Sequence, residues 1–411
     1  MSELSYLEKL LDGAEVEWLP LGVLGELVRG NGLPKTDFTE AGIPAIHYGQ
    51  IYTFYGLSTE TTKSFVSQDT AKKLKKVNTG DVVITNTSEN LDDVGKALVY
   101  LGKEQAVTGG HATIFKPREG IIGKYFAYFT QTNSFYNEKR KYSKGTKVID
   151  VSASDMAKII IPIPCPNNPE KSLAIQSEIV RILDKFTALT AELTAELNMR
   201  KKQYNYYRDQ LLSFDEAEVE WKTLADVAIL RRGRVMSKGY LEQNAGDYPV
   251  YSSQTARNGM IGSIDTYDFD GEFISWTTDG ANAGTVFYRT GKFSITNVCG
   301  LIKIHENYPI SYKYLYYWLS IEAQKHVYSG MGNPKLMSHQ VEKITVPIPF
   351  PASPEKSMLE QQRIVGILDK LEAITFSLTE GLPREIELRQ KQYEYYRDLL
   401  FSFPKPEAAS N

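Results

Sequence analysis

Hydrophobic residues along one stretch of the chain are separated mostly by alternating steps of four and three positions. That spacing is typical of a long helix whose apolar seam packs against another helix. The seam residues are Ile175, Ile179, Ile182, Phe186, Leu189, Leu193, Leu197, Tyr204, Tyr207 and Leu211. A helix of about 38 residues would be roughly 57 Å long. The pattern predicts either a spacer helix in a coiled coil or an ordinary pair of core helices.

The same predicted helix returns later in the chain. The segment IPIPCPNNPEKSLAIQSEIVRILDKF from Ile161 recurs from Val346 as VPIPFPASPEKSMLEQQRIVGILDKL, with 15 identities in 26 positions, 185 residues on. The segment KKQYNYYRDQLLSF from Lys201 recurs from Gln390 as QKQYEYYRDLLFSF, with 10 identities in 14 positions, 189 residues on. Such repetition indicates two copies of one plan and favours the spacer. At Gly381-Leu382-Pro383 we expect a kink or break in the second helix.

A proline-rich run precedes each predicted helix, from Pro162 to Pro169 and from Pro347 to Pro354. Because proline fixes φ and lacks a backbone donor, we expect each run to be stiff and extended, and not helical. A third repeat marks the start of each copy. It pairs Glu15-Val16-Glu17-Trp18 with Glu218-Val219-Glu220-Trp221, Leu21 with Leu224, and Arg29-Gly30 with Arg232-Gly233.

The regions between these repeats share a pattern of elements but little sequence. In the first we expect strands at residues 80–87, 96–102 and 112–116 and a helix near 124–141. In the second we expect strands at 271–278, 285–290 and 294–304 and a helix near 311–328. Strands followed by one helix predict an α+β domain, used twice.

The repeats divide the chain into two variable domains, each followed by a constant region. We place the first domain at residues 1–160, the first constant region at 161–214, the second domain at 215–345 and the second constant region at 346–411. Residues 1–17 resemble the junction at 211–220, whereas the second helix ends near Phe403 without entering another domain. We therefore expect residues 1–17 to pack on the C-terminal helix and close a circular arrangement.

Composition and charge change this picture little. No apolar run approaches the roughly 18 residues of a membrane span, and the polar start is not a secretory signal, so we expect a cytoplasmic protein. The 47 basic and 50 acidic residues give a net charge of −3, so any DNA-binding face must be basic locally. An ordinary solvated surface explains any single basic run equally well. The runs are Lys72, Lys73, Lys75, Lys76; Lys139, Arg140, Lys141, Lys144, Lys147; and Arg231, Arg232, Arg234.

Catalytic chemistry is not recognisable in the sequence. There is no Gly-x-x-x-x-Gly-Lys-Ser/Thr phosphate loop and no Asn-Pro-Pro-aromatic run for an extruded adenine. Glu220-Trp221-Lys222 resembles the end of a nuclease motif but lacks an upstream aspartate. The two cysteines, Cys165 and Cys299, and the five histidines show no metal-ligand spacing. We expect no catalytic residue and no metal site in this chain.

The constant regions closely resemble the specificity subunits of type I restriction–modification enzymes, in particular the IC class. The resemblance covers residues 1–20, 158–222 and 344–411, and its most specific runs are PEKSLAIQSEIVRILDKFTALTAELTAELNMRKKQYNYYRDQLLSF and EGLPREIELRQKQYEYYRDLLFSFPKP. It implies two mixed α/β target-recognition domains separated by two long antiparallel helices, with an internal pseudo-twofold repeat. Each domain would read one half of a split, asymmetric DNA site.

The resemblance also implies partners. Two modification subunits would dock on the helices and methylate adenine with S-adenosylmethionine, and restriction subunits would add cleavage and translocation that depend on ATP and Mg. This chain would itself hold no cofactor, contact no membrane and catalyse nothing. Two other classes stay open: a DNA methyltransferase or nuclease with an unrecognised active site, and a coiled-coil scaffold without a DNA role.

Three pairs of loops are the predicted DNA contacts, because polar side chains read base edges and lysines hold phosphates. For any single residue an ordinary turn is the alternative. The first pair aligns Asn86, Thr87, Ser88, Asn90 with Thr277, Thr278, Asp279, Asn282. The second comprises His47, Tyr48, Gln50, Tyr52 and Ser252, Ser253, Gln254, Arg257, Asn258. The third comprises Lys144, Thr146, Lys147 and Asn333, Lys335, and Arg232 and Arg234 add charge.

A tandem TAELTAEL lies inside the first predicted helix and has no counterpart in the second. It consists of Thr190, Ala191, Glu192, Leu193, Thr194, Ala195, Glu196 and Leu197. The seam steps by four twice across it, a local stutter. Relatives in the family are similar in varying this repeat, which implies that it sets the spacer between the two half-sites; a neutral slippage repeat is the alternative.

Overall fold

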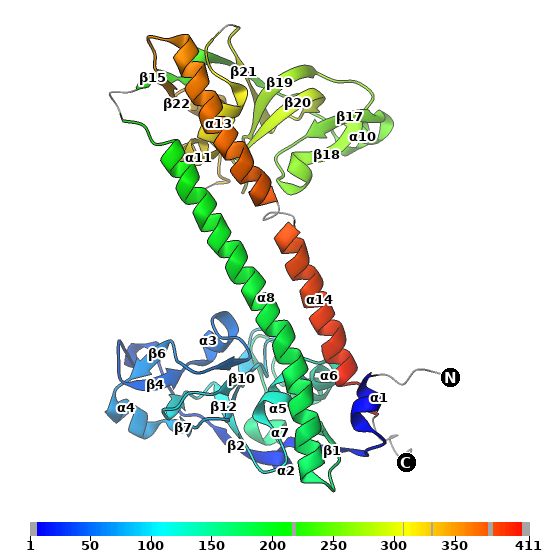
Figure 1. The fold of residues 1–411 in the computed structure, drawn as a ribbon. Helices are drawn as coiled ribbons and strands as arrows, with labels where there is room; N and C mark the ends of the chain where they lie inside the picture. The colour runs from blue at the N-terminus through cyan, green and yellow to red at the C-terminus, as the bar shows by residue number, and fades with distance from the viewer. Residues whose placement is uncertain (1–5, 216–218, 307, 330–331, 377–380, 405–411) are drawn as a thin grey trace. The chain divides into compact units, whose positions relative to one another are not determined.

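The chain forms two units, and each combines one variable region with parts of the long helices (Figure 1). The structure, a computed structural model, describes residues 6–215, 219–306, 308–329, 332–376 and 381–404. Unit 1 contains residues 1–195 and 384–411, and unit 2 contains residues 196–383. Unit 1 is therefore built from both ends of the chain.

Two five-stranded sheets form the variable part of unit 1. The first has the order β2 (Gly25–Arg29), β12 (Ala112–Pro117), β8 (Val82–Thr85), β10 (Ala97–Tyr100), β5 (Ser58–Thr59). The second has the order β3 (Phe38–Thr39), β6 (Ser64–Val66), β4 (Ile43–Ile46), β11 (Ala106–Thr108), β7 (Lys75–Val77). The unit also has four short helices, α2 (Leu21–Leu24), α3 (Tyr48–Thr53), α4 (Gln68–Lys73) and α7 (Ala153–Met156), of which α3 connects the second sheet to the first. The three predicted strands are confirmed as β8, β10 and β12, but β8 ends at Thr85 and a separate strand β9 (Thr87–Ser88) follows.

The single helix predicted near residues 124–141 is wrong, because the structure has two, α5 (Gly123–Phe129) and α6 (Asn133–Tyr142). They are separate because the Thr132 hydroxyl accepts a hydrogen bond from the Phe135 amide at 3.3 Å and caps the start of α6. Residues 125–129 are all buried, since α5 packs against β8 and β10 on one side and meets α8 (Pro169–Leu211) on the other. A helix covered on both sides has no polar face.

Unit 2 holds one six-stranded sheet. Its order is β16 (Ala228–Arg232), β21 (Cys299–Ile304), β19 (Phe269–Thr277), β20 (Val286–Ile295), β17 (Ala245–Tyr251), β18 (Met260–Ile264). The strand predicted at 294–304 begins only at Cys299, because β20 continues to Ile295 in its ladder with β19. The helix predicted to reach residue 328 ends at Glu322 as α11 (Tyr312–Glu322), and a 3₁₀ turn follows. The shorter helices are α9 (Leu224–Val227), α10 (Lys238–Gln243) and α12 (Ser338–Val341).

The repeated Glu-Val-Glu-Trp and proline-rich segments pair with each other in both units. β1 (Val16–Pro20) runs antiparallel to β14 (Ile160–Pro164), and β15 (Val219–Thr223) to β22 (Thr345–Pro349). Prolines at every second position fit this pairing, because the residues between them make the ladder bonds, as Cys165 N does with Glu15 O at 2.8 Å. Glu218 lies outside the described residues.

The proline runs are extended only in their first part, to Pro164 and Pro349, where β14 and β22 end. Each run then turns at Cys165 or Phe350, whose φ angles are +50° and +48°, and the Asn168 and Ser353 amides donate to the carbonyls of those two residues at 2.9 Å. The prediction that each run is extended throughout is therefore wrong. Pro169 and Pro354 are the first residues of α8 and α13 (Pro354–Phe376), so the prediction that they are not helical is wrong. Proline is tolerated there because the first turn of a helix needs no backbone donor. The break expected near Pro383 is confirmed, since α13 ends at Phe376 and α14 (Leu382–Leu400) begins afresh.

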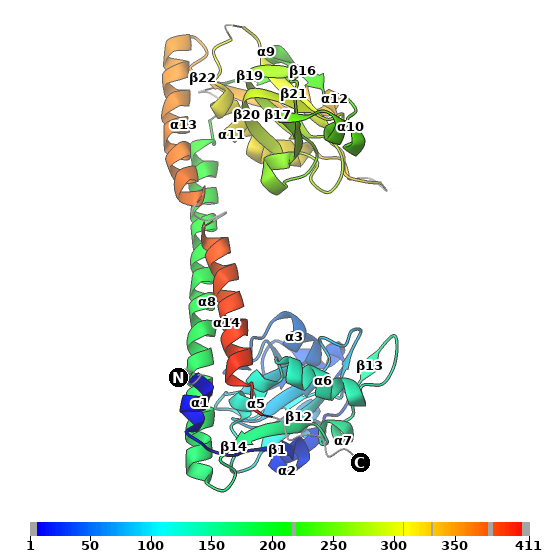
Figure 2. The same ribbon diagram turned by 90° about the vertical axis from the view of Figure 1, so that its right-hand side faces the viewer.

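In unit 1 the first part of α8 and α14 lie side by side and run in opposite directions (Figure 1, Figure 2). The rings of Phe186 and Tyr396 stack between them at 5.2 Å. The predicted seam holds for Ile175 and Ile179, which are buried, but not for Leu189, which is 37% exposed. Leu189 lies beyond Thr187, where the variable region hydrogen-bonds to α8. The variable region therefore covers Leu189 less than it covers the earlier seam residues. The exposed Tyr207, in unit 2, also departs from the seam.

Both ends of the chain contribute to the core of unit 1. Leu7 and Leu11 of α1 (Tyr6–Leu11) share one buried cluster with Leu400 and Phe401, and Leu10 packs against it. The Trp18 indole donates to Pro404 O at 2.8 Å. The N-terminal segment thus lies beside the end of α14, as the circular arrangement requires.

Candidate nucleic-acid interface

Three loops that are far apart in the sequence meet at the end of β8 in unit 1. The Tyr52 hydroxyl of α3 donates to Thr87 O at 2.7 Å. β9 pairs with β13 (Ile149–Asp150), and the hairpin from Lys144 to Asp150 closes through their mutual backbone hydrogen bonds. All three loop regions predicted for the first domain are therefore neighbours.

An aromatic cluster supports this junction. The Tyr48 ring lies 4.6 Å from that of His47 and 4.7 Å from that of His111, and His111 Nδ1 is 3.0 Å from Thr87 Oγ1. Burial lowers the pKa of His47, and nearby Lys35 and His111 lower it further. The neutral His47 ring then accepts a hydrogen bond from Gly49 N at 3.1 Å and caps α3. His47 thus holds the loop in place and does not face solvent.

The loops of the second domain meet in the same way in unit 2. The Asn282 side chain donates to Ser253 O at 3.3 Å, which joins the loop after β19 to the loop after β17. Asp279 forms a backbone bridge with Lys335, whose Nζ is 3.8 Å from the Asp279 carboxylate. Both domains therefore build one junction from three corresponding loops.

Backbone hydrogen bonds correct the alignment of the two junctions by one residue. Gly95 N donates to Thr85 O and Gly284 N to Thr277 O, both at 2.9 Å. Thr85 is thus the counterpart of Thr277, Asn86 of Thr278 and Thr87 of Asp279. The alignment of Asn86 with Thr277 was wrong because the flanking sequences have diverged, whereas the hydrogen-bond pattern has not.

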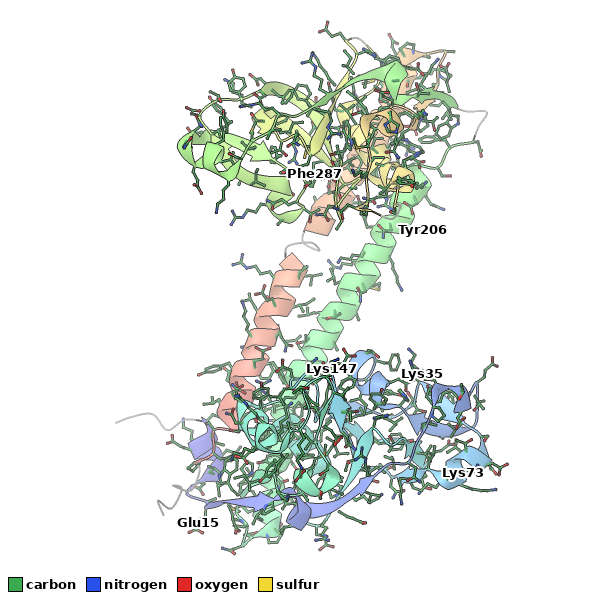
Figure 3. All side chains as sticks on the ribbon, turned by 180° about the vertical axis from the view of Figure 1, so that it is seen from behind. Glu15, Lys35, Lys73, Lys147, Tyr206 and Phe287 are labelled. Carbon is green, nitrogen blue, oxygen red and sulfur yellow. The ribbon has the colours of Figure 1, made fainter. Side chains whose placement is uncertain are left out.

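Burial separates the candidate residues into two groups. Asn86, Thr277 and Thr278 are fully buried, and Gln50 and Gln254 donate to Ser64 Oγ and Met260 O, both at 2.5 Å. Lys144 pairs with Asp155 at 2.8 Å and Arg234 with Asp268 at 2.9 Å. The exposed members are Asn90, Lys144, Thr146, Lys147, Arg232, Arg234, Arg257, Asn258, Asn333 and Lys335, so Lys144 and Arg234 are exposed although they are ion-paired. Figure 3 labels Lys147, with Lys35 and Lys73 on the same unit.

Two buried polar atoms in the first junction lack a hydrogen-bond partner: Asn86 Nδ2 and Asp150 Oδ2. They lie near each other, because Val151 N donates to Asn86 O and Asp150 pairs with Thr87. An unsatisfied donor and acceptor are costly in a folded chain, so this place suits a water molecule or a ligand group. Among the described residues these are the only such side-chain atoms.

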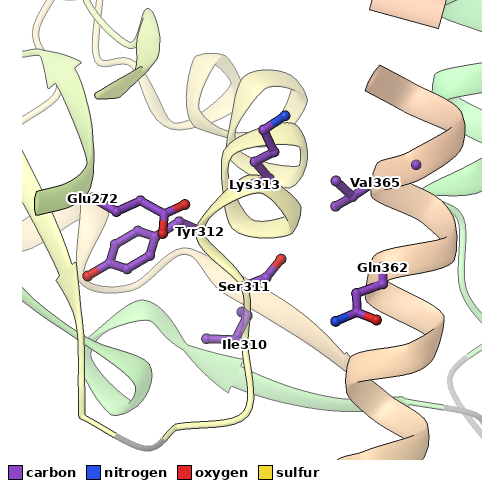
Figure 4. A pocket seen from close by; sticks show the side chains of 8 residues that line it. Glu272, Ile310, Ser311, Tyr312, Lys313, Gln362 and Val365 are labelled. Carbon is purple, nitrogen blue, oxygen red and sulfur yellow. The ribbon is translucent and has the colours of Figure 1, made fainter. Parts of the chain in front are cut away.

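Neither a metal centre nor a membrane helix is found in the part of the chain that the structure describes. It contains no group of three His, Cys, Asp or Glu side chains arranged to hold a metal ion. Within the same residues no helix is long and apolar enough to cross a bilayer. A pocket of about 430 Å³ in unit 2 lies between α11 and α13 and has Glu272, Lys313 and Gln362 in its lining (Figure 4). Its Lys313 is already paired with Asp369 at 2.6 Å.

Comparison with known proteins identifies the family. The family model described as "Type I restriction modification DNA specificity domain" matches residues 15–200 and again 216–388. The specificity subunit of the Escherichia coli type I restriction enzyme EcoR124I/EcoR124II is 40% identical over the whole of both chains. The chain belongs to this family of specificity subunits. The Escherichia coli EcoprrI specificity subunit is 34% identical over 92% of this chain and 93% of its own length.

Solved structures agree on the fold of this specificity subunit. The type I S subunit from M. genitalium matches with a TM-score of 0.58 at 16% identity, over 98% of this chain and 99% of that chain. At such low identity the match shows the fold alone. The fold is the expected one: two repeated mixed α/β domains with the long helix α8 between them in the sequence.

A contact between each recognition domain and its helix was missed from the sequence. Lys124 Nζ and the Tyr128 hydroxyl both bind the Asp184 carboxylate of α8, at 2.8 and 2.6 Å. In unit 2, Lys313 and Tyr317 bind Asp369 of α13 in the same way, at 2.6 and 2.7 Å. We call these two sets the domain clamps. Their signal was available, because Lys-Tyr-x-x-Tyr at 124–128 recurs at 313–317, 189 residues on.

Proposed function

We propose that this specificity subunit reads a bipartite, asymmetric DNA sequence, with one half-site for each recognition domain. The observation that carries the proposal is the three-loop junction, which is built twice with the same backbone hydrogen bonds and different side chains. Thr87 in the first junction corresponds to Asp279 in the second, and Asp150 corresponds to Lys335. One frame that presents two sets of donors and acceptors suits two different base sequences.

The exposed side chains of the junctions are the proposed base and phosphate contacts. Lys147 and Thr146 lie on the hairpin that ends at Asp150, and Lys335 closes the corresponding hairpin in unit 2. The buried members, such as Asn86 and Thr278, would fix the loops from behind.

The helices carry a matching pair of exposed apolar stripes. On α8, Met199 and Tyr206 are each 58% exposed, and on α14 the corresponding Leu388 and Tyr395 are 51% and 64% exposed. Each pair is seven residues apart and so lies on one helix face. Two equal stripes fit two copies of one partner, and we assign them to two modification subunits. S-adenosylmethionine, ATP and Mg would then belong to the modification and restriction subunits, and this chain would be non-catalytic.

Methylome sequencing of a cell that expresses this chain with its modification subunit tests the proposal. We expect methylated adenines in one split motif with an unread spacer, and none in a control cell that lacks this chain. Methyl transfer by the isolated chain would instead establish an enzyme. DNA affinity that is unchanged after both variable regions are exchanged would favour the scaffold.

A further inference from the structure

One arginine occupies the same place in both recognition domains. Arg29 is the last residue of β2 and Arg232 the last of β16, and each is followed by a glycine. Arg29 Nε donates to Gly110 O at 3.2 Å, and Arg232 Nη2 donates to Asn297 O at 2.5 Å. Both acceptors lie in the turn before the strand that pairs with β2 or β16.

The glycine after each arginine permits a close backbone approach. A Cβ on Gly30 would lie 2.1 Å from Gly109 O, and one on Gly233 would lie 2.2 Å from Ile295 O. Any side chain would push the loop away and displace the carbonyl that orients the guanidinium. The arginine and the glycine therefore act together: the glycine lets the loop approach closely, and a carbonyl of that loop orients the guanidinium.

Each arginine also makes a long ion pair with one carboxylate. Arg29 Nη2 is 3.8 Å from Asp150, and Arg232 Nη2 is 3.9 Å from Asp279. Asp150 lies on the third loop of the first junction and Asp279 on the first loop of the second, and these are the two loops that pair with each other in each junction. The position of the negative charge is therefore kept, although the residue that supplies it has changed. The arginine side chains are 49% and 33% exposed, which leaves donors free to bind a ligand at the junction.

We propose that Arg29 and Arg232 each hold a DNA phosphate at equivalent positions of the two half-sites. The inference rests on the proposed function. A residue that both domains share cannot distinguish two different half-sites. An exposed arginine that is common to both domains, and that lies beside loop residues that have diverged, therefore suits the phosphate backbone, which is the same in every DNA sequence. A guanidinium binds phosphate in two-pronged geometry.

Salt-dependent DNA binding by the complex with its modification subunits tests this inference. Arg29→Gln and Arg232→Gln should each weaken binding by about tenfold to hundredfold. Each should reduce the slope of log affinity against log salt by about 0.9, and the double variant by about 1.8. The methylated motif should stay the same in all three.

Arg118→Gln is the matched control, because Arg118 also donates to a backbone carbonyl, Val23 O at 3.3 Å, but follows the opposite end of β12. It should leave affinity and slope unchanged. A motif that becomes degenerate in one half-site would show that the arginines read bases, and an unchanged slope would show a structural role; either overturns the inference. If the wild-type complex binds motif and scrambled duplexes equally, the proposed function itself fails.

Discussion

At the scale of the residue, single side chains couple each recognition domain to its helix. In each domain the clamp lysine and tyrosine bind the helix, and a second tyrosine binds the proline-containing strand. This second tyrosine is Tyr125 or Tyr314, which donates to Pro162 O or Pro347 O, each at 2.8 Å. Gln176 and Gln361 complete the contact by donating to Gly120 O and Pro309 O, at 2.8 and 2.9 Å. Repetition of the whole set shows that the attachment of domain to helix is part of the duplicated plan.

Removing one clamp hydroxyl should loosen one domain. Tyr128→Phe should lower the free energy of opening of α5 by about 1–2 kcal/mol, because the lost hydrogen bond has a charged acceptor that is partly exposed. Hydrogen exchange of the α5 amides in the native chain measures this. Tyr395→Phe, at a position 64% exposed, should change the exchange little. Equal α5 exchange in Tyr128→Phe and wild type would contradict the role of the clamp.

Lys139 is a buried cation whose charge opposes folding. Its Nζ donates to Asp92 O and Val94 O at 3.0 and 2.7 Å, and burial lowers its pKa from 10.5 to about 8. Between these values the unfolded chain binds the additional proton, so this group should favour folding more as pH rises from about 8 to 10.5.

The Lys139→Met variant lacks this titration. The stability of the wild type relative to Lys139→Met should therefore rise with pH in that window, by up to about 1.4 kcal/mol per pH unit. Denaturant unfolding of both chains at several pH values measures the difference. A difference that is constant from pH 7.5 to 9.5 would mean that Lys139 is not the titrating group.

At the scale of the element, the tandem TAELTAEL lies just beyond the clamp. The domain hydrogen-bonds to α8 at Thr187, the repeat starts three residues later at Thr190, and only Leu197 within it is buried. The division between the two units also falls inside the repeat, after Ala195. Residues with few contacts can be added or removed without breaking either clamp.

A third TAEL copy should lengthen the unread spacer by one base pair and leave both half-sites unchanged. Four residues add about 6 Å and roughly 40° beyond a full turn, which nearly preserves the seam. A one-residue insertion at the same point is the control, because it turns the seam by about 100° and should impair assembly. Methylome sequencing decides the outcome, and an unaltered spacer would mean that α8 is not the ruler.

At the scale of the whole molecule, the duplication makes each domain a replaceable part. Its borders are the β1–β14 and β15–β22 pairs, and the strands of both pairs come from the repeated segments. The clamp residues Asp184 and Asp369 also belong to these constant segments. A foreign domain of the same family would meet the same partners.

Replacing residues 18–158 with the corresponding region of a relative should change one half-site only. The second junction lies wholly in unit 2 and keeps its loops, so its half-site should be retained. Methylome sequencing of the chimaera checks this, and the reciprocal exchange of the second domain is its control. A change in both half-sites would contradict a modular arrangement.

The sequence by itself determined the duplication, the long helices, the break before Pro383 and the family. These features rest on local periodicity and on repeats that persist because both copies make the same contacts. The sequence also located the loops of the junctions, since polar residues after buried strands stood out in each copy.

Only the tertiary structure decided which residues of those loops share a surface. His47 and Asn86 are polar but buried. The correspondence between Thr87 in the first domain and Asp279 in the second follows from backbone hydrogen bonds, because the side chains around them have diverged. Arg29 and the clamp residues act through partners about 56 to 121 positions away, as Lys124 and Tyr128 do with Asp184 and Arg29 does with Asp150. Such contacts leave no local period, because the folded chain, and not the spacing of residues, brings the partners together.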